Sequence, residues 1–222
     1  MDSSVHFCRI HRIHPDPDIC IKGQRIPCVQ EARFLGLTFD RRLTWVPHLK
    51  SLKGKCLEAL KIFKALAHTS WGADRKMLLR LYKALILSKI SYGCEVYSSA
   101  LPSRLKMLDS IHHAGIRLAT GAFKSSPIQS LLVEAGEMPL ELHRQNLACR
   151  YWFKVQRLPN SLAFKSLVKE NFFRFYETHP KLPQPFGFRV RQLLNNFNLK
   201  RDVVIPFKIP VIPPWKLPVF IL

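Results

Sequence analysis

The chain has 222 residues, 47% of them hydrophobic, which is enough for one domain with its own core and tails. It carries 35 Lys and Arg against 15 Asp and Glu, a formal net charge of +20 at pH 7. Such an excess favours an anionic partner, with nucleic acid ahead of an acidic membrane surface or an acidic protein. Because no apolar stretch approaches about 18 uninterrupted residues, the sequence predicts no membrane-spanning helix.

The cysteines predict a reduced, intracellular protein. They stand at positions 8, 20, 28, 56, 94 and 149, with no CxxC pair and no spacing typical of a disulfide framework. The N-terminus has no apolar signal segment. His6, Cys8, His11 and His14 crowd together, but they match no common ligand spacing and alternate along an expected strand. We therefore expect no metal site in this chain.

Residues 31–45, EARFLGLTFDRRLTW, alternate like a strand, with Gly36 interrupting the run. A glycine inside a strand often marks a bulge or the close approach of a ligand or another backbone. On pattern alone, however, this is an ordinary core strand. We expect it to end at the charged turn Asp40–Arg42. With the short extended pieces before it, it predicts a small β-meander over residues 5–40.

At Pro47 the apolar period changes from 2 to 3.6, which predicts four or five helices over residues 48–158. The first, residues 48–67, has a continuous apolar stripe. Four lysines lie beside that stripe and span about 80° of the helix surface. We call them the lysine lane: Lys50, Lys53, Lys61 and Lys64. A merely solvated face is the plain alternative.

Asp74 is the expected N-cap of a second helix reaching Tyr92, with Arg75 and Lys76 in its first turn. Beyond Pro159, residues 160–178 leave room for one more helix, and the prolines from position 180 onward predict an extended connector. The expected fold is mainly α: a small N-terminal β-meander, a helical bundle and a Pro-rich extended C-terminal tail, α+β overall. The expected domains are 1–46, 47–158 and 159–222.

Three phrases resemble reverse transcriptases of jockey-type non-LTR retrotransposons: FLGLTFD at 34–40, WGADR with LLRLYKALI at 71–86, and LDSIHHAG at 108–115. The resemblance implies terminal palm strands with a primer-grip-like strand over 1–46. It also implies a thumb and connection bundle over 47–158 and a connector toward ribonuclease H over 159–222. The implied partners are nucleic acid (RNA, DNA or an RNA–DNA hybrid) and the remainder of the polymerase.

The resemblance also implies nucleic-acid-binding residues. Phe34, Leu35 and Gly36 would lie at the mouth of a cleft between the β-meander and the first helix, where Gly36 would let a primer backbone approach. The lysine lane, Arg75 and Lys76 would contact phosphates.

Polymerases of this class hold two metals with paired Asp residues, and the sequence has no Asp-Asp pair. The last 50 residues carry only Glu177 and Asp202, too few for a ribonuclease H cluster. We therefore expect no catalytic site and no cofactor in this chain, and magnesium only in the palm and ribonuclease H parts of such enzymes. Two alternatives stay open: a stand-alone basic helical RNA- or DNA-binding module, and a helical interaction protein with incidental charge.

Overall fold

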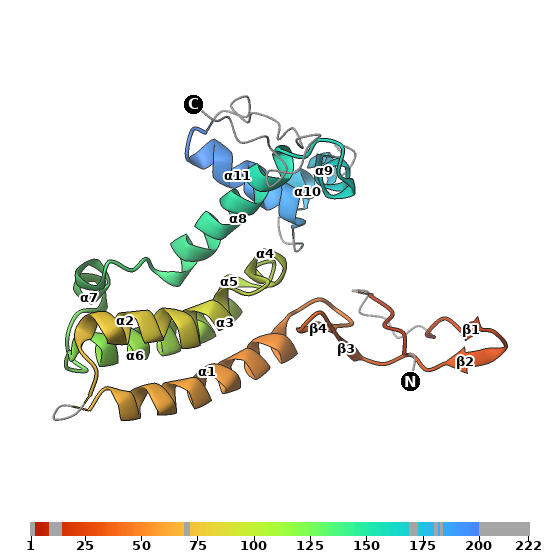
Figure 1. Ribbon diagram of the computed structural model, residues 1–222. Coiled ribbons are helices and arrows are strands. Elements are labelled where there is room, and N and C mark those ends of the chain that lie inside the picture. The colour runs from red at the N-terminus through yellow and green to blue at the C-terminus, as the bar shows by residue number, and fades with distance from the viewer. Residues whose placement is uncertain are drawn as a thin grey trace, which may run out of the picture. The chain divides into compact units, whose positions relative to one another are not determined.

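A computed structural model describes residues 3–8, 15–68, 72–168, 173–179, 182 and 184–199 (Figure 1). The strands are β1 (Ile19–Ile21), β2 (Gln24–Ile26), β3 (Glu31–Phe34) and β4 (Leu37–Asp40). The helices are α1 (Val46–Leu66), α2 (Arg75–Tyr82), the π-helical η1 (Lys83–Leu87), α3 (Ser88–Ser91), α4 (Cys94–Tyr97), α5 (Pro102–Leu105), the 3-10 helix η2 (Lys106–Leu108), α6 (Asp109–Thr120), α7 (Ile128–Ala135), α8 (Leu140–Gln156), α9 (Leu162–Val168), α10 (Phe173–Thr178) and α11 (Phe186–Asn196). The chain divides into two compact units, 1–147 and 148–222.

The described strands form two separate antiparallel hairpins, β1–β2 and β3–β4. The β3–β4 hairpin pairs Glu31 with Asp40 and Phe34 with Leu37, so Leu35 and Gly36 are its two-residue turn. The prediction of one strand running through Gly36 is therefore wrong. Both turn residues have positive φ, 46° and 81°, as tight hairpin turns of this length require. Leucine rarely adopts this conformation, so the sequence did not indicate a turn here.

Asp40, the last residue of β4, fixes the start of α1. Its carboxylate accepts the backbone N–H of Thr44 at 2.9 Å and that of Trp45 at 2.7 Å. Trp45 is buried, and its indole N–H donates to the Ser99 hydroxyl at 2.8 Å. The hairpin, the first helix and the segment after α4 are thereby joined around one buried aromatic ring.

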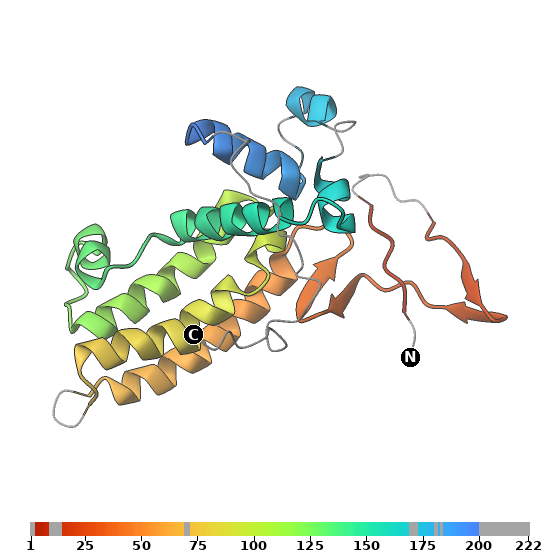
Figure 2. The same cartoon turned by 45° about the horizontal axis from the view of Figure 1, so that its top comes forward.

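In the first unit, α1 packs against η1, α3 and α6, and α2 packs on α6 (Figure 2). The side chains between these helices form one apolar core, which includes Leu49, Cys56, Phe63, Ile86, Ile90, Leu108, Ile111 and Ile116. The Tyr82 ring lies in the space over Gly115, where an added Cβ would come within 2.6 Å of it. The Tyr82 hydroxyl hydrogen-bonds to His112 Nδ1, and both side chains are buried. His112 therefore has a packing role.

The helix predicted from Asp74 to Tyr92 begins at the expected cap, because the Asp74 carboxylate accepts the Met77 N–H at 2.8 Å. It is not uniformly α-helical, since η1 is a π-helical segment within it. It ends at Tyr92 and Gly93, and Gly93 has a left-handed φ of 65°. The mainly α fold class is confirmed, and the small β region takes the form of two hairpins.

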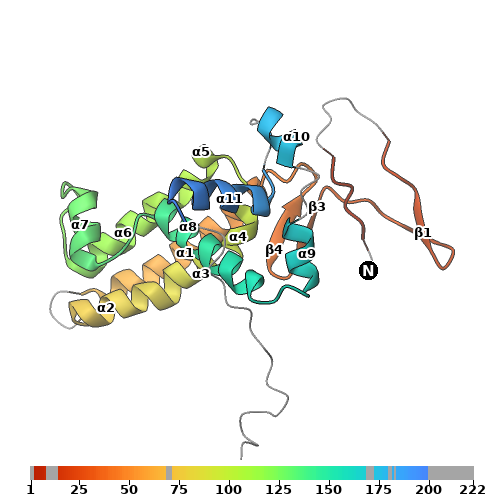
Figure 3. The ribbon, with the colours of Figure 1, turned by 90° about the horizontal axis from the view of Figure 1, so that it is seen from above.

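The second unit contains the last part of α8 and helices α9 to α11 (Figure 3). Ala148 and Trp152 of α8 pack against Val190 and Leu194 of α11. Helix α11 departs from the expected irregular connector. Pro185 immediately precedes the helix and residues 186–196 contain no proline, so proline starts the helix rather than breaking it. The expected extended tail over 200–222 lies outside the described residues. Among the described helices, none has the length and apolar character needed to span a membrane.

Candidate nucleic-acid interface

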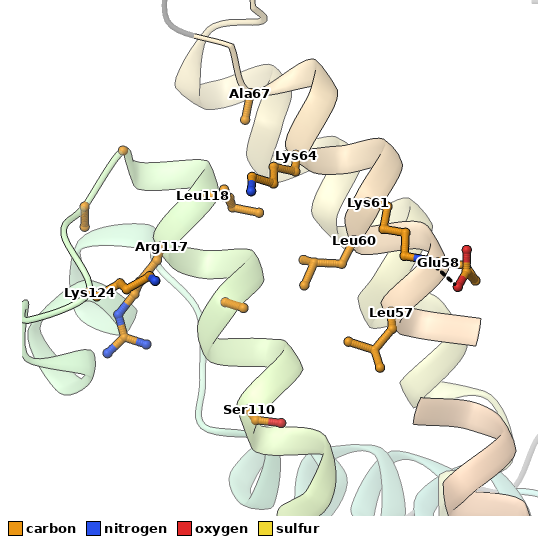
Figure 4. A pocket seen from close by; sticks show the side chains of 13 residues that line it. Leu57, Glu58, Leu60, Lys61, Lys64, Ala67, Ser110, Arg117, Leu118 and Lys124 are labelled. Atoms are coloured by element: carbon orange, nitrogen blue, oxygen red, sulfur yellow. Dashed lines mark hydrogen bonds and ion pairs between the residues drawn. The ribbon is translucent and has the colours of Figure 1, made fainter. Parts of the chain in front are cut away.

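A groove runs between α1 and α6 within the first unit (Figure 4). We call it the α1–α6 groove, and its volume is about 770 Å³. Its lining comes from α1 (Leu57, Glu58, Leu60, Lys61, Lys64), from Ala67 after it, from α6 (Ser110, Ala114, Arg117, Leu118) and from the following loop (Gly121, Ala122, Lys124). Leu57, Leu60, Lys61 and Lys64 follow the i, i+3, i+4, i+7 spacing that puts side chains on one helix face.

The α1–α6 groove combines an apolar floor with a cationic rim. Lys61 and Lys64 line it from α1, and Arg117 and Lys124 line it from the other side. Glu58 is the one carboxylate among the lining residues, and it pairs with Lys61 at 2.9 Å. An excess of positive charge in a concave surface raises the local concentration of anions. Such a surface can hold phosphates.

Only part of the lysine lane lies in the α1–α6 groove. Lys61 and Lys64 line the groove, whereas Lys50 and Lys53 lie outside it, about 16 Å and 12 Å before Lys61 along the helix. Lys50 is exposed and Lys53 is half-buried. Sequence reasoning missed Arg117 and Lys124, because nothing in the local pattern of α6 indicates which helix it faces.

Phe34, Leu35 and Gly36 lie at the other end of α1, at the turn of the β3–β4 hairpin (Figure 1). Phe34 is 65% exposed and Leu35 is 73% exposed. The Tyr92 hydroxyl donates to the Leu35 carbonyl at 2.8 Å, and a Cβ added at Gly36 would lie 3.2 Å from the Tyr92 ring. The close approach that Gly36 permits in this structure is therefore to Tyr92.

Arg75 is already engaged in an ion pair. Its guanidinium lies 2.6 Å from the Glu134 carboxylate and also donates to the Glu134 carbonyl at 2.8 Å. Lys76, the next residue, is exposed. Because Glu134 offsets the charge of Arg75, Lys76 offers the larger net positive charge to a phosphate.

Other cations surround the start of α1. Burial, and after it the positive charges of Lys55 and Arg33, lower the pKa of His48. The Thr38 backbone N–H lies 3.4 Å from His48 Nδ1, so the His48 imidazole lies next to β4. Lys55 is about 120° around α1 from Lys61. Positive charge therefore covers more than one side of α1.

The comparisons with known proteins point in one direction. The chain is 24% identical over 166 residues to a Pol polyprotein from type-1 retrotransposable element R1 4 of Nasonia vitripennis, covering 70% of this chain and 41% of that protein. It is 28% identical over 134 residues to the R1 Pol polyprotein of Bradysia coprophila, covering 57% and 13%. It is 27% identical over 156 residues to the RNA-directed DNA polymerase from mobile element jockey of Drosophila melanogaster, covering 67% and 16%.

The chain is similar to the reverse transcriptases of R1-type and jockey-type retrotransposons. The resemblance drawn from the three sequence phrases is thereby confirmed. The chain spans less than half the length of these curated relatives. No protein-family model matches it, and no solved structure matches it.

Polymerases that use two metal ions hold them with clustered carboxylates. Within the described ranges, no group of three or more His, Cys, Asp and Glu side chains is placed to hold a metal ion. His6 lies 3.2 Å from the Asp16 carboxylate, which also pairs with Arg41 at 2.7 Å. His11 and His14 lie outside the described residues.

Proposed function

We propose that this chain is the thumb and connection part of a retrotransposon RNA-directed DNA polymerase and that it grips primer–template duplex. The observation that carries the proposal is the basic face of α1, whose lysine lane runs along the helix and ends with Lys61 and Lys64 in the lining of the α1–α6 groove. The formal charge of +20 supports an anionic partner. The similarity to proteins named as RNA-directed DNA polymerases supports nucleic acid as that partner.

The lysine lane suits a duplex backbone. From Lys50 to Lys64 it extends about 21 Å along α1, because an α-helix rises about 1.5 Å per residue. Phosphates of one strand recur about every 3.4 Å along a duplex axis, so this length spans roughly six of them. Contacts of this kind hold a duplex in place without reading its sequence.

In this proposal the chain binds the duplex and carries no catalytic site of its own. Neither an Asp-Asp pair nor a ribonuclease H carboxylate cluster occurs in its sequence. In this proposal magnesium is held by the palm and ribonuclease H parts of such a polymerase. Purified chain incubated with magnesium, nucleotides and primed template should incorporate no nucleotide, and incorporation would refute this part of the proposal.

Salt dependence of duplex binding tests the grip. Each lysine that neutralises a phosphate contributes about 0.9 to the slope of log affinity against log salt on a DNA duplex. Replacing Lys50, Lys53, Lys61 and Lys64 with Gln should therefore reduce the slope by about 3 to 4. The matched control replaces four exposed lysines outside the lane with Gln: Lys22, Lys106, Lys154 and Lys165. If the lane variant kept the wild-type slope, these lysines would only be solvated.

Preference among ligands separates the thumb from the alternatives. A thumb should prefer an RNA–DNA hybrid over a DNA duplex of the same sequence, whereas a stand-alone basic module needs no such preference. A helical interaction protein should bind neither duplex with a steep salt slope. Fluorescence anisotropy with labelled hybrid and DNA duplexes measures all three outcomes.

A further inference from the structure

The floor of the α1–α6 groove does not suit a duplex. Leu57, Leu60 and Leu118 contribute apolar surface to it, and Leu57 is 41% exposed. A duplex presents phosphates and sugars outward and keeps its base faces stacked inside. An unpaired nucleotide instead offers a flat, largely apolar base face next to a phosphate. A groove with an apolar floor and a cationic rim matches that second shape.

An exposed aromatic ring lies at the edge of the same groove. Phe123 is 81% exposed and stands between Ala122 and Lys124, both of which line the groove while Phe123 does not. Its backbone is therefore continuous with the lining of the groove, and its exposed ring is not part of that lining. Every base has a flat face that can stack on such a ring, whatever the sequence.

The loop that carries Phe123 is held in place by α6. Gly121 ends the helix with a left-handed φ of 68°, and the Ala122 N–H donates to the Arg117 carbonyl at 3.1 Å. The Arg117 guanidinium donates to the Ser126 carbonyl at 3.3 Å, on the far side of Phe123. Arg117 therefore both lines the groove and fixes the loop that presents the ring.

We propose that the α1–α6 groove and Phe123 bind the unpaired nucleotides of a single strand that extends beyond a bound duplex. One base enters the apolar floor, and a neighbouring base stacks on Phe123. The phosphates between them contact Arg117 and Lys124, while the lysine lane, Lys64 included, holds the duplex. The groove lies toward the C-terminal end of α1, so a duplex along the lysine lane from Lys50 leads into it. This inference rests on the proposed function.

The test compares two ligands: a blunt RNA–DNA hybrid and the same hybrid with a four-nucleotide overhang that carries 2-aminopurine, whose fluorescence falls on stacking. Wild-type protein should bind the overhang ligand more tightly than the blunt one and quench the 2-aminopurine. Phe123→Ala should weaken overhang binding by about 5- to 150-fold, the range for loss of one stacked base. It should leave blunt-hybrid affinity unchanged. Phe123→Tyr should restore both affinity and quenching.

Val133→Ala is the matched control, because Val133 is an equally exposed apolar residue, 83%, on the neighbouring α7. It should leave both ligands unaffected. Equal wild-type affinity for the two ligands, with a steep salt slope, would overturn the inference and leave the proposed function standing. Absence of salt-dependent binding to either ligand would overturn both. The protein could also self-associate, with Phe123→Ala abolishing self-association and leaving oligonucleotide binding unchanged. That result would assign the groove to a second copy of the chain and overturn the inference.

Discussion

The hydroxyl of Tyr92 donates a hydrogen bond of 2.8 Å to the carbonyl of Leu35, although the two residues are 57 positions apart. One end of this bond is the hairpin turn, and the other is the bend where α3 ends. Leu37, just after the turn, reinforces the contact, because its side chain would lie 2.8 Å from a Cβ added at Gly93. The turn of the β3–β4 hairpin is thus held by the helical body.

Tyr92→Phe removes this hydrogen bond and keeps the ring. We expect it to lower the free energy of unfolding by about 0.5 kcal/mol, the low end of the usual range, because Tyr92 is 59% exposed. Urea unfolding of the two proteins measures the change. Tyr151→Phe is the control, since no hydrogen bond of Tyr151 is present among the described residues. Equal effects of the two variants would contradict the role given to Tyr92.

Gly36→Ala should destabilise the protein more than Gly23→Ala. Both glycines are hairpin-turn residues with positive φ, 81° and 77°, so a Cβ costs about 1–2 kcal/mol at either position. At Gly36 the new methyl also lies 3.2 Å from the Tyr92 ring, whereas nothing lies within 4 Å at Gly23. The difference between the two unfolding free energies isolates the contact with Tyr92. No difference would mean that the ring moves aside freely.

Local patterns predicted the helices because caps and apolar stripes are encoded nearby in sequence. Residues 48–67 were expected to be helical and α1 spans Val46–Leu66, while Asp74 caps α2 as its residue type suggests. The β3–β4 turn escaped prediction because Leu35 takes an unfavourable left-handed conformation. Alternation of apolar residues on both sides of the turn hid it.

The candidate interface was only half predictable. The lysine lane is a property of one helix and follows from its periodicity. Arg117 and Lys124 join it through packing of α6 on α1, within the apolar core that the two helices share. Such long-range contacts leave no periodic trace in the sequence.

Asp40→Ala should cost about 1–2 kcal/mol of unfolding free energy. Its carboxylate accepts two backbone N–H groups and the Thr44 hydroxyl at the start of α1, and it is half-buried. Asp74→Ala is the comparison, because its exposed carboxylate accepts one N–H, that of Met77. We expect the loss at Asp74 to be smaller, as measured by thermal and urea unfolding. A larger loss at Asp74 would contradict the view that Asp40 joins hairpin and helix.

Gly115→Ala and Gly54→Ala should have opposite effects. The methyl at position 115 would lie 2.6 Å from the buried Tyr82 ring, so overpacking should cost about 1–3 kcal/mol. At position 54, on the exposed side of α1, nothing lies within 4 Å, and alanine should stabilise the helix by about 0.5–1 kcal/mol. Unfolding midpoints measure both. Stabilisation by Gly115→Ala would show that the Tyr82 ring is not confined.

His112 should make stability fall in mild acid. Burial, and after it the nearby charge of His113, lowers the pKa of His112 to about 4. In the unfolded chain His112 has the ordinary histidine pKa of 6.5. Between about pH 6.5 and pH 4 it is therefore protonated in the unfolded chain but neutral in the folded one. Stability should be fully present above about pH 6.5 and should fall toward pH 4, by up to about 3 kcal/mol. The pKa values of His48 and His113 are also lowered and add to the same trend.

His112→Asn tests this assignment, because asparagine keeps an acceptor for the Tyr82 hydroxyl but cannot titrate. We expect the variant to lose stability at pH 7.5 and to show a shallower fall between pH 7.5 and 4.5 than the wild-type protein. The range ends at pH 4.5 to keep Asp16 from contributing. The hydrogen bond from His6 lowers the pKa of Asp16, so protonation of this carboxylate costs stability only below its ordinary value of 3.8. Urea unfolding at each pH gives the slope directly. If the two proteins kept parallel slopes, the buried His112 would not be the titrating group, and the acid sensitivity would belong to His48 and His113.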